Sequence, residues 1–310
     1  MVFATRPDDL VQPFQIDRFG LRGRIVRLGG VIDTILARHD YPEPLATMLG
    51  ELIAMTPALA AALKFDGVFS LQIHGDGPVR LMVADCTTDG GLRGYAGYDA
   101  ERFEKALAEP GAVDLRRFLG KGYLSLTVDQ GPDTERYQGI VDLEGSSLAD
   151  CVRRYFVQSE QIGAEIKAAA IQRTEESGNG WRAGCIMIQT VPQEGGHDSG
   201  APIDEDAMED AWRRTRLLMD TATTDELTDP DLSAPVLLNR LFSEDGVWVY
   251  RPHALSAECR CSNERVLGVL RSFPEEEVAD MVTDEGEIVV TCEFCSRRYI
   301  YAPSDVVATH

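Results

Sequence analysis

Two closely spaced cysteine pairs near the C-terminal end constrain this chain more than any other feature. They are Cys259-Arg260-Cys261 and Cys292-Glu293-Phe294-Cys295, and 30 residues separate them. Four thiolates from two such pairs match the all-sulfur ligand set of a tetrahedral zinc ion. The sequence therefore predicts one Zn²⁺ per chain, bound by Cys259, Cys261, Cys292 and Cys295. The alternative is four unliganded cysteines in a reduced protein.

The region that holds these cysteines, residues 257–310, is predicted to form a small separate domain. A unit of about 50 residues rarely folds on apolar burial alone, and a bound metal would supply the missing stabilisation. The residues between the two cysteine pairs are predicted to form a helix capped by Ser262, a second helix that begins at Pro274, and a strand over Ile288–Val290 that leads to Cys292.

The same spacing permits a second chemistry, because cysteines two or three positions apart can form short-loop disulfides. Zinc holds its ligands as thiolates, the reactive form of the side chain. Oxidation to Cys259–Cys261 and Cys292–Cys295 disulfides would remove every ligand and eject the metal, and the small domain should then unfold. A purely structural zinc site remains the alternative.

Length and charge limit the remaining possibilities. The 310 residues suggest two domains, and the net charge of −21 opposes binding to nucleic acid or to anionic membranes. The longest apolar run, residues 58–63, is too short to span a bilayer, and the N-terminal residues do not resemble a secretory signal. We expect a cytoplasmic protein.

The acidic excess is concentrated in residues 194–256, which we call the linker. Residues 194–258 contain 15 acidic and five basic side chains, and the Gly-rich stretch 194–202 is predicted to begin the linker at a domain boundary. One predicted linker helix has an apolar face formed by Met208, Ala211, Trp212, Thr215, Leu218 and Met219, and a second follows Ser233. These helices lack a core of their own, so we expect them to dock on the first domain and to be easily released. Met208, Trp212, Leu218 and Met219 are the candidate docking or client-binding surface.

Residues 1–193 are predicted to form an α+β core domain of antiparallel sheet and helices. The pattern predicts a helix over residues 44–63, hairpins over 69–83 and 124–143, and a strand over 185–191. A further helix is predicted to begin after Ser147 and to place Ile162 and Ile166 on its apolar face. The isolated Cys86, Cys151 and Cys185 are expected to be buried.

Several segments of the chain resemble one known family. They are LKFDGVFSLQIHGDGP from Leu63, DCTTDGGLRGYA from Asp85, GKGYLSLTVD from Gly120, YFVQSEQI from Tyr155, and the two cysteine pairs. Together they resemble the redox-regulated holdase chaperones of bacteria, the thirty-three-kilodalton heat shock protein family. The linker is the least similar part.

The resemblance implies a chaperone that hydrolyses no ATP. In that family the reduced, zinc-bound form is an inactive monomer. Oxidant, usually with mild heat, forms two disulfides, releases zinc and unfolds the zinc domain and linker. Dimers then hold unfolding client proteins against aggregation. The resemblance carries these roles onto Cys259, Cys261, Cys292 and Cys295 and onto the linker.

Two other functions fit the sequence less well. A thiol–disulfide oxidoreductase using Cys292 and Cys295 would normally carry its pair near a βαβ pattern and would leave Cys259 and Cys261 unexplained. A zinc-ribbon nucleic-acid module is opposed by the acidic side chains around the cysteines. We therefore expect unfolded proteins, rather than nucleic acid or membrane, as partners, and no enzymatic activity.

Overall fold

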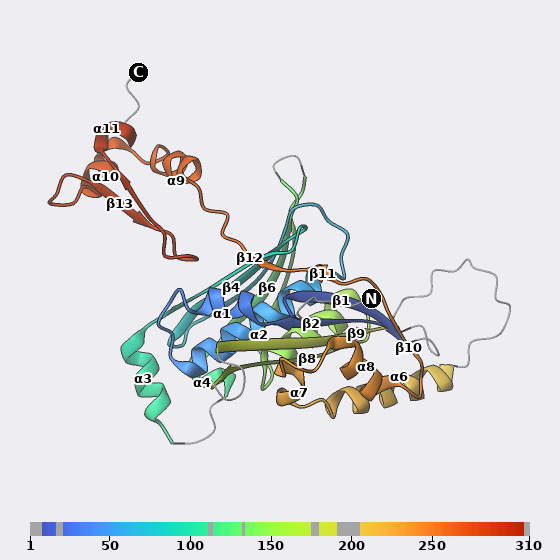
Figure 1. The fold of residues 1–310 in the computed structure, drawn as a ribbon. Helices are drawn as coiled ribbons and strands as arrows, with labels where there is room; N and C mark the ends of the chain where they lie inside the picture. Colours follow the sequence, from blue (N-terminus) through green and yellow to red (C-terminus); the bar gives the residue numbers. More distant parts are fainter. Residues whose placement is uncertain are drawn as a thin grey trace. The chain divides into compact units, whose positions relative to one another are not determined.

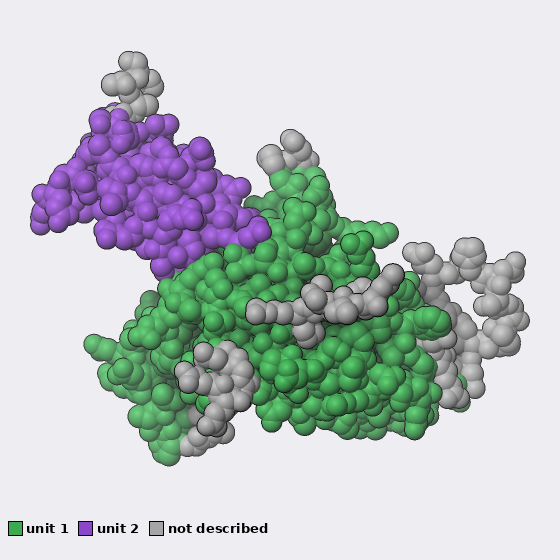
Figure 2. All heavy atoms as spheres, in the orientation of Figure 1, with its two compact units in different colours: residues 1–257 green, residues 258–310 purple. Residues whose placement is uncertain are grey.

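The computed structural model describes residues 8–16, 21–110, 114–131, 134–174, 180–190 and 205–306. The chain forms two compact units, residues 1–257 and 258–310 (Figure 2). The predicted domain boundary at residues 194–202 lies outside the described residues. The described linker residues, 205–256, belong to the first unit.

The first unit is built on two sheets (Figure 1). The first sheet has the order β10-β1-β2-β9-β8, and β11 also pairs with β1. Its strands are β1 (Leu10–Ile16), β2 (Leu21–Leu28), β8 (Ala164–Arg173), β9 (Gly180–Gln189), β10 (Val247–Val249) and β11 (His253–Ala254). All of its pairs are antiparallel.

The second sheet has the order β12-β5-β4-β3-β6-β7. Its strands are β3 (Val68–Gly75), β4 (Val79–Thr87), β5 (Gly91–Tyr98), β6 (Gly122–Asp129), β7 (Tyr137–Asp142) and β12 (Ser256–Ala257). Only the short pair β12–β5 is parallel. The hairpins β3–β4 and β6–β7 correspond to the two that the sequence predicts.

Helix α2 (Glu43–Ala60) packs between the two sheets and contacts strands of both. Its apolar positions Leu45, Leu49, Leu52 and Ile53 are fully buried, as the helical spacing requires. The other helices of the core are α1 (Gly30–Leu36), α3 (Ala100–Ala108), α4 (Leu115–Leu119), α5 (Leu148–Tyr155) and the π-helical turn η2 (Phe156–Glu160).

The helix predicted from Ser147 through Ile166 is wrong in its second half. The Ser147 side chain caps α5 in a capping box, but α5 ends at Tyr155 and the π-helical turn follows. Gln161 then adopts a left-handed conformation with φ of 54°, which ends the helical path. Ile166 lies in strand β8 instead.

The linker forms α6 (Glu205–Asp220), α7 (Thr224–Thr228) and α8 (Ala234–Phe242) before strands β10–β12. These helices lie against the first sheet (Figure 1). They share a buried apolar cluster with it. Phe14 of β1 stacks with Phe242 of α8 at a ring-centroid distance of 6.1 Å. The linker helices therefore cover the face of the first sheet that points away from α2.

The second unit contains α9 (Asn263–Leu270), α10 (Glu275–Asp280), β13 (Ile288–Thr291), β14 (Arg298–Tyr301) and α11 (Pro303–Val306). β13 and β14 pair antiparallel. The predicted α+β class is confirmed. Among the helices in the described parts of the chain, none has the length and hydropathy needed to span a membrane.

Candidate metal centre

Two short loops of the second unit carry the four predicted cysteines. Cys259 and Cys261 precede α9, whose first turn is capped by the Ser262 side chain. The Arg265 guanidinium donates to the carbonyl oxygen of Arg260 at 2.7 Å, which fixes the loop between the two cysteines.

Cys292 and Cys295 lie in the turn that joins β13 to β14. The Cys292 amide donates to the Arg297 carbonyl at 2.9 Å, and the Ser296 amide donates to the Cys292 carbonyl at 2.8 Å. Ser296 has a φ of 58°, the left-handed conformation that tight turns use. These bonds close the turn and hold the two cysteines near each other.

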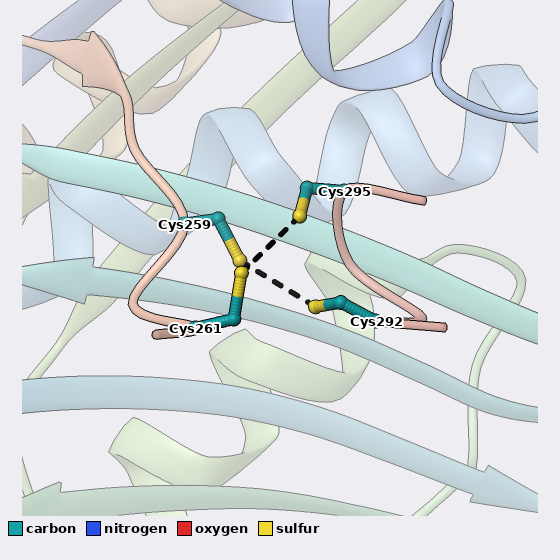
Figure 3. Close-up of side chains that lie close together, drawn as sticks. All are labelled: Cys259, Cys261, Cys292 and Cys295. Atoms are coloured by element: carbon teal, nitrogen blue, oxygen red, sulfur yellow. Dashed lines mark hydrogen bonds between the residues drawn. The ribbon is translucent and has the colours of Figure 1, made fainter. Parts of the chain in front are cut away.

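The four sulfur atoms form one cluster, shown in Figure 3, and all lie within 4.8 Å of one another. The Cys259 and Cys292 Sγ atoms are 3.7 Å apart, and those of Cys261 and Cys295 are 3.4 Å apart. Tetrahedral zinc with Zn–S bonds of about 2.3 Å places its sulfurs about 3.8 Å apart. The four thiols therefore fit this ion in both donor type and spacing.

The local environment shifts the pKa values of Cys261, Cys292 and Cys295 in different directions. Desolvation opposes ionisation of Cys261, but Tyr299 and the neighbouring thiols outweigh it and lower the pKa of Cys261 to about 7. Desolvation raises the pKa of Cys292 and raises that of Cys295 to about 12. Cys261 therefore ionises more readily than Cys292 or Cys295, and a bound dication would favour the thiolate form of all four cysteines.

The apolar core around this site is small. The buried residues of the second unit form one cluster of Leu270, Val278, Ile288, Tyr301 and Val306. Such a core cannot offset the conformational entropy of about 50 ordered residues. The unit consequently needs a further source of stability, and a structural zinc site contributes about 10–16 kcal/mol.

The other three cysteines belong to the first unit. Cys86, Cys151 and Cys185 are all buried. Burial raises the pKa of each thiol, that of Cys86 to about 12. In the described parts of the chain, no second group of metal-binding side chains accompanies the cysteine cluster.

The predicted linker surface is only partly buried. Met219 is fully buried in the cluster that α6 shares with the first sheet, and Trp212 and Leu218 pack against the edge of that cluster. Ala211 and Thr215 are buried as well, whereas Met208 is only half-buried.

The sequence reasoning missed three arginines that hold the linker, which we call the arginine clamp: Arg27 of β2, Arg173 of β8 and Arg182 of β9. Arg27 donates to the carbonyl oxygens of Glu226 and Asp229, and Arg182 Nε donates to that of Thr228 at 2.9 Å. Arg173 donates to the Thr228 hydroxyl at 2.9 Å. These cations satisfy the carbonyl end of α7, where positive charge is favoured. The sequence signal that could have identified these residues is the presence of arginines within otherwise apolar strands.

A family model described as Hsp33 protein matches residues 9–302 of this chain. The chain belongs to the Hsp33 family. A protein named 33 kDa chaperonin from Caulobacter vibrioides is 46% identical over 96% of this chain and 95% of its own length. The 33 kDa chaperonin of Pseudomonas fluorescens is 35% identical over 97% of this chain and 93% of its own.

A solved Hsp33 structure has the same fold. The crystal structure of the 33 kDa chaperonin from Thermotoga maritima superposes with a TM-score of 0.78 at 22% identity and covers 96% of each chain. The predicted family is thus confirmed. Hsp33 proteins are named as chaperonins, which are not enzymes.

Proposed function

We propose that this chain is an ATP-independent holdase whose activity is controlled by a zinc–thiolate redox switch. The observation that carries the proposal is the cluster of four sulfur atoms within 4.8 Å in a chain of the Hsp33 family. In the reduced state Cys259, Cys261, Cys292 and Cys295 would hold one Zn²⁺, which ties the two loops of the second unit together. The reduced protein would be an inactive, cytoplasmic monomer.

Activation is an oxidation of these thiolates. Each disulfide forms as two cysteine thiolates give up two electrons, and one molecule of hydrogen peroxide takes up these electrons with two protons from solvent and becomes two water molecules. Two disulfides therefore consume two peroxides and release the Zn²⁺. The proposed bonds are Cys259–Cys261 and Cys292–Cys295, although sulfur distances of 3.7 and 3.4 Å also place Cys259 beside Cys292 and Cys261 beside Cys295. Mass-spectrometric mapping of the disulfides tests this pairing.

Loss of the metal would unfold the second unit. Its buried core of five apolar side chains is too small to replace the metal's contribution. Short-loop disulfides restore little stability, because the entropic benefit of a cross-link grows with the length of the loop it closes. The oxidised unit should therefore lose its structure.

Client binding would follow from release of the linker. The linker helices cover an apolar sheet face that includes Phe14, Ile25 and Ile186. When they detach, that face and the apolar side chains of α6, among them Met208, Trp212, Leu218 and Met219, become available to unfolded client proteins. Newly exposed apolar surface of this kind would also explain a dimer in the oxidised state.

The test measures zinc content, zinc release and chaperone activity together. The reduced protein should contain one zinc per chain, and peroxide at raised temperature should release it as suppression of client aggregation appears. Zinc release without any gain in suppression would reject the chaperone switch. Repeated turnover with a dithiol reductant would instead support an oxidoreductase, although Cys292 and Cys295 lie in a strand-to-strand turn rather than at a helix start.

A further inference from the structure

The outer edge of strand β1 is covered by a segment that buries few side chains and pairs with β1 only in part. One edge of β1 pairs with β2 along its whole length. The other edge pairs with part of segment 247–257, which we call the strap: β10 lies opposite Phe14–Ile16, and β11 lies opposite Leu10 and Val11. The strap therefore protects an edge strand that would otherwise be open to pairing with another chain.

Backbone groups dominate this contact. The Tyr250 amide donates to the Pro13 carbonyl at 3.0 Å, and the Leu255 amide donates to the Asp9 carbonyl at 2.8 Å. The Gln12 side chain donates to the Tyr250 carbonyl at 3.0 Å. Main-chain bonds of this kind recognise an extended peptide with little regard for its sequence.

The side chains of the strap contribute little. Leu255 is its only buried apolar side chain, while Trp248 is 62% exposed and Tyr250 is 51% exposed. The residues of β11 are exposed, and Val247 and Val249 are half-buried. A segment held mainly by exposed backbone hydrogen bonds is readily replaced by another extended segment.

The pairing of the strap with β1 is also interrupted. Between the two paired stretches β1 has two residues, Gln12 and Pro13, but the strap has three, residues 250–252. This extra residue forms a bulge, which breaks the regular ladder of hydrogen bonds. A regular strand could pair with β1 without this break.

The strap is covalently next to the proposed switch. Its last residue, Ala257, pairs with Leu92 of β5, and the first sulfur ligand, Cys259, follows two residues later. Unfolding of the second unit therefore removes the folded anchor at the C-terminal end of the strap. This end is held by the two-residue strand β12 and by Leu255.

From these observations we propose that the outer edge of β1 is a client-binding site, on which an extended backbone segment of an unfolded protein replaces the strap by strand addition. This inference rests on the proposed holdase function and specifies how a client is recognised. The strap acts as an internal competitor: it occupies the edge in the reduced chain and yields it after oxidation.

The chemistry of the edge fits a regulated site. Pro13 and its alternate neighbours Val11 and Gln15 direct their backbone groups toward the strap. Pro13 has no N–H to donate, so the centre of the edge supports only limited pairing. Such a strand can accept a client segment and still resist extended self-association.

Backbone-modified peptides test the proposal on the full-length oxidised protein. The parent peptide has about ten residues of alternating valine and threonine with a lysine at each end. A second peptide carries N-methyl groups on alternate residues, which block one edge and leave the other free. A third carries them on consecutive residues, which block both edges while every side chain is kept.

We expect the first two peptides to bind the oxidised chain equally and the third to bind about 10- to 100-fold more weakly, because several backbone hydrogen bonds are lost. Equal binding of all three would overturn strand addition, and so would a one-edge peptide that binds as weakly as the third. Suppression of aggregation, measured on the same sample, reports on the holdase function separately.

A matched pair of variants identifies the edge. Gln15→Pro removes an amide that faces the strap, whereas Gln15→Ala keeps it, and both remove the side-chain oxygen that accepts a bond from the Tyr250 hydroxyl. The oxidised proline variant should bind the parent peptide at least about fivefold more weakly than the alanine variant. If the proline variant fails to fold, amide exchange of Val11 and Gln15 in the unmodified chain decides, because their amides face the strap whereas the intervening residues face β2. These two amides should be protected in the reduced form, exchange after oxidation, and regain protection with peptide. Lasting protection after oxidation, or none regained, would contradict the proposal.

Discussion

The guanidinium group of Arg27 donates a hydrogen bond to the carbonyl oxygen of Glu226 at 3.0 Å, and so joins β2 of the core to the carbonyl end of α7 in the linker. The Arg27 side chain is only 1% exposed. A buried cation that satisfies backbone carbonyls is expensive to remove, because the carbonyls then lose their partners. This residue should therefore control how tightly the linker docks.

Replacing Arg27 by methionine should loosen the linker without affecting the cysteines. We expect docking of residues 223–232 to weaken by about 2–4 kcal/mol, because two charged hydrogen bonds are lost at a buried site. Hydrogen exchange of that segment would measure the change. Zinc content should stay at the level of the parent protein.

The control for this variant is Arg240→Met on α8. Arg240 is 57% exposed and its ion pair with Glu226 spans 3.8 Å, so its loss should change docking by less than about 1 kcal/mol. If the two variants exchanged alike, the arginine clamp would have no special part in holding the linker.

Replacing Met219 by a smaller side chain should weaken the apolar contact through which the linker docks on the first sheet. Met219 is fully buried against the first sheet, and its replacement by alanine should cost about 2–4 kcal/mol. The reduced variant should already suppress aggregation of an unfolding client in part. Leu217→Ala is the matched control, because Leu217 lies on the same helix but is 63% exposed. An equal gain of activity in both variants would argue against docking through the Met219 face.

Substitution of Cys261 by serine should break the metal centre. Loss of an outer-shell partner of a metal ligand already costs 10- to 100-fold in affinity, so loss of a ligand should weaken zinc binding by more than about 100-fold. Competition with a chromogenic chelator measures this. Ser262→Ala removes the cap of α9 and costs only about 1 kcal/mol of local stability, so it should retain zinc. Normal zinc affinity in the Cys261 variant would contradict the ligand assignment.

Burial raises the pKa of Glu51, on α2, to about 7. Because the folded state prefers the protonated carboxyl, its contribution to the free energy of unfolding is greatest below pH 4.5 and is lost as pH rises toward 7. The loss amounts to about 1–3 kcal/mol. Glu51→Gln should therefore become more stable than the parent between pH 5 and pH 8, as measured by urea unfolding of the first unit. Glu101→Gln, at an exposed site on α3, should show no such trend.

Local patterns in the sequence predicted the elements whose partners are near in the chain. The hairpins β3–β4 and β6–β7 and helix α2 have strong alternation or helical spacing and short connections. The four metal-binding cysteines could also be predicted from the sequence, since paired cysteines have few other uses in a reducing compartment. The structure brings all four together.

Elements fixed by distant partners could not be predicted in this way. The pairing of β1 with β10 joins Phe14 to Val249, and no local pattern encodes that register. Strand β8 was taken for helix because Ile162 and Ile166 continued the helical spacing of α5, and the left-handed Gln161 that ends it gives no apolar signal. The arginine clamp was missed for the same reason, because its acceptors lie in the linker, 46 to 202 residues further along the chain than the arginines that bind them.

The burial of Cys86, Cys151 and Cys185 has a consequence for the electron count of the switch. Their thiols are shielded and hard to ionise, so peroxide should not react with them while the core stays folded. A fully oxidised chain would then take up two equivalents of oxidant and, once denatured, still present three free thiols of its original seven. That stoichiometry distinguishes a reversible change at the C-terminal cysteines from general oxidative damage.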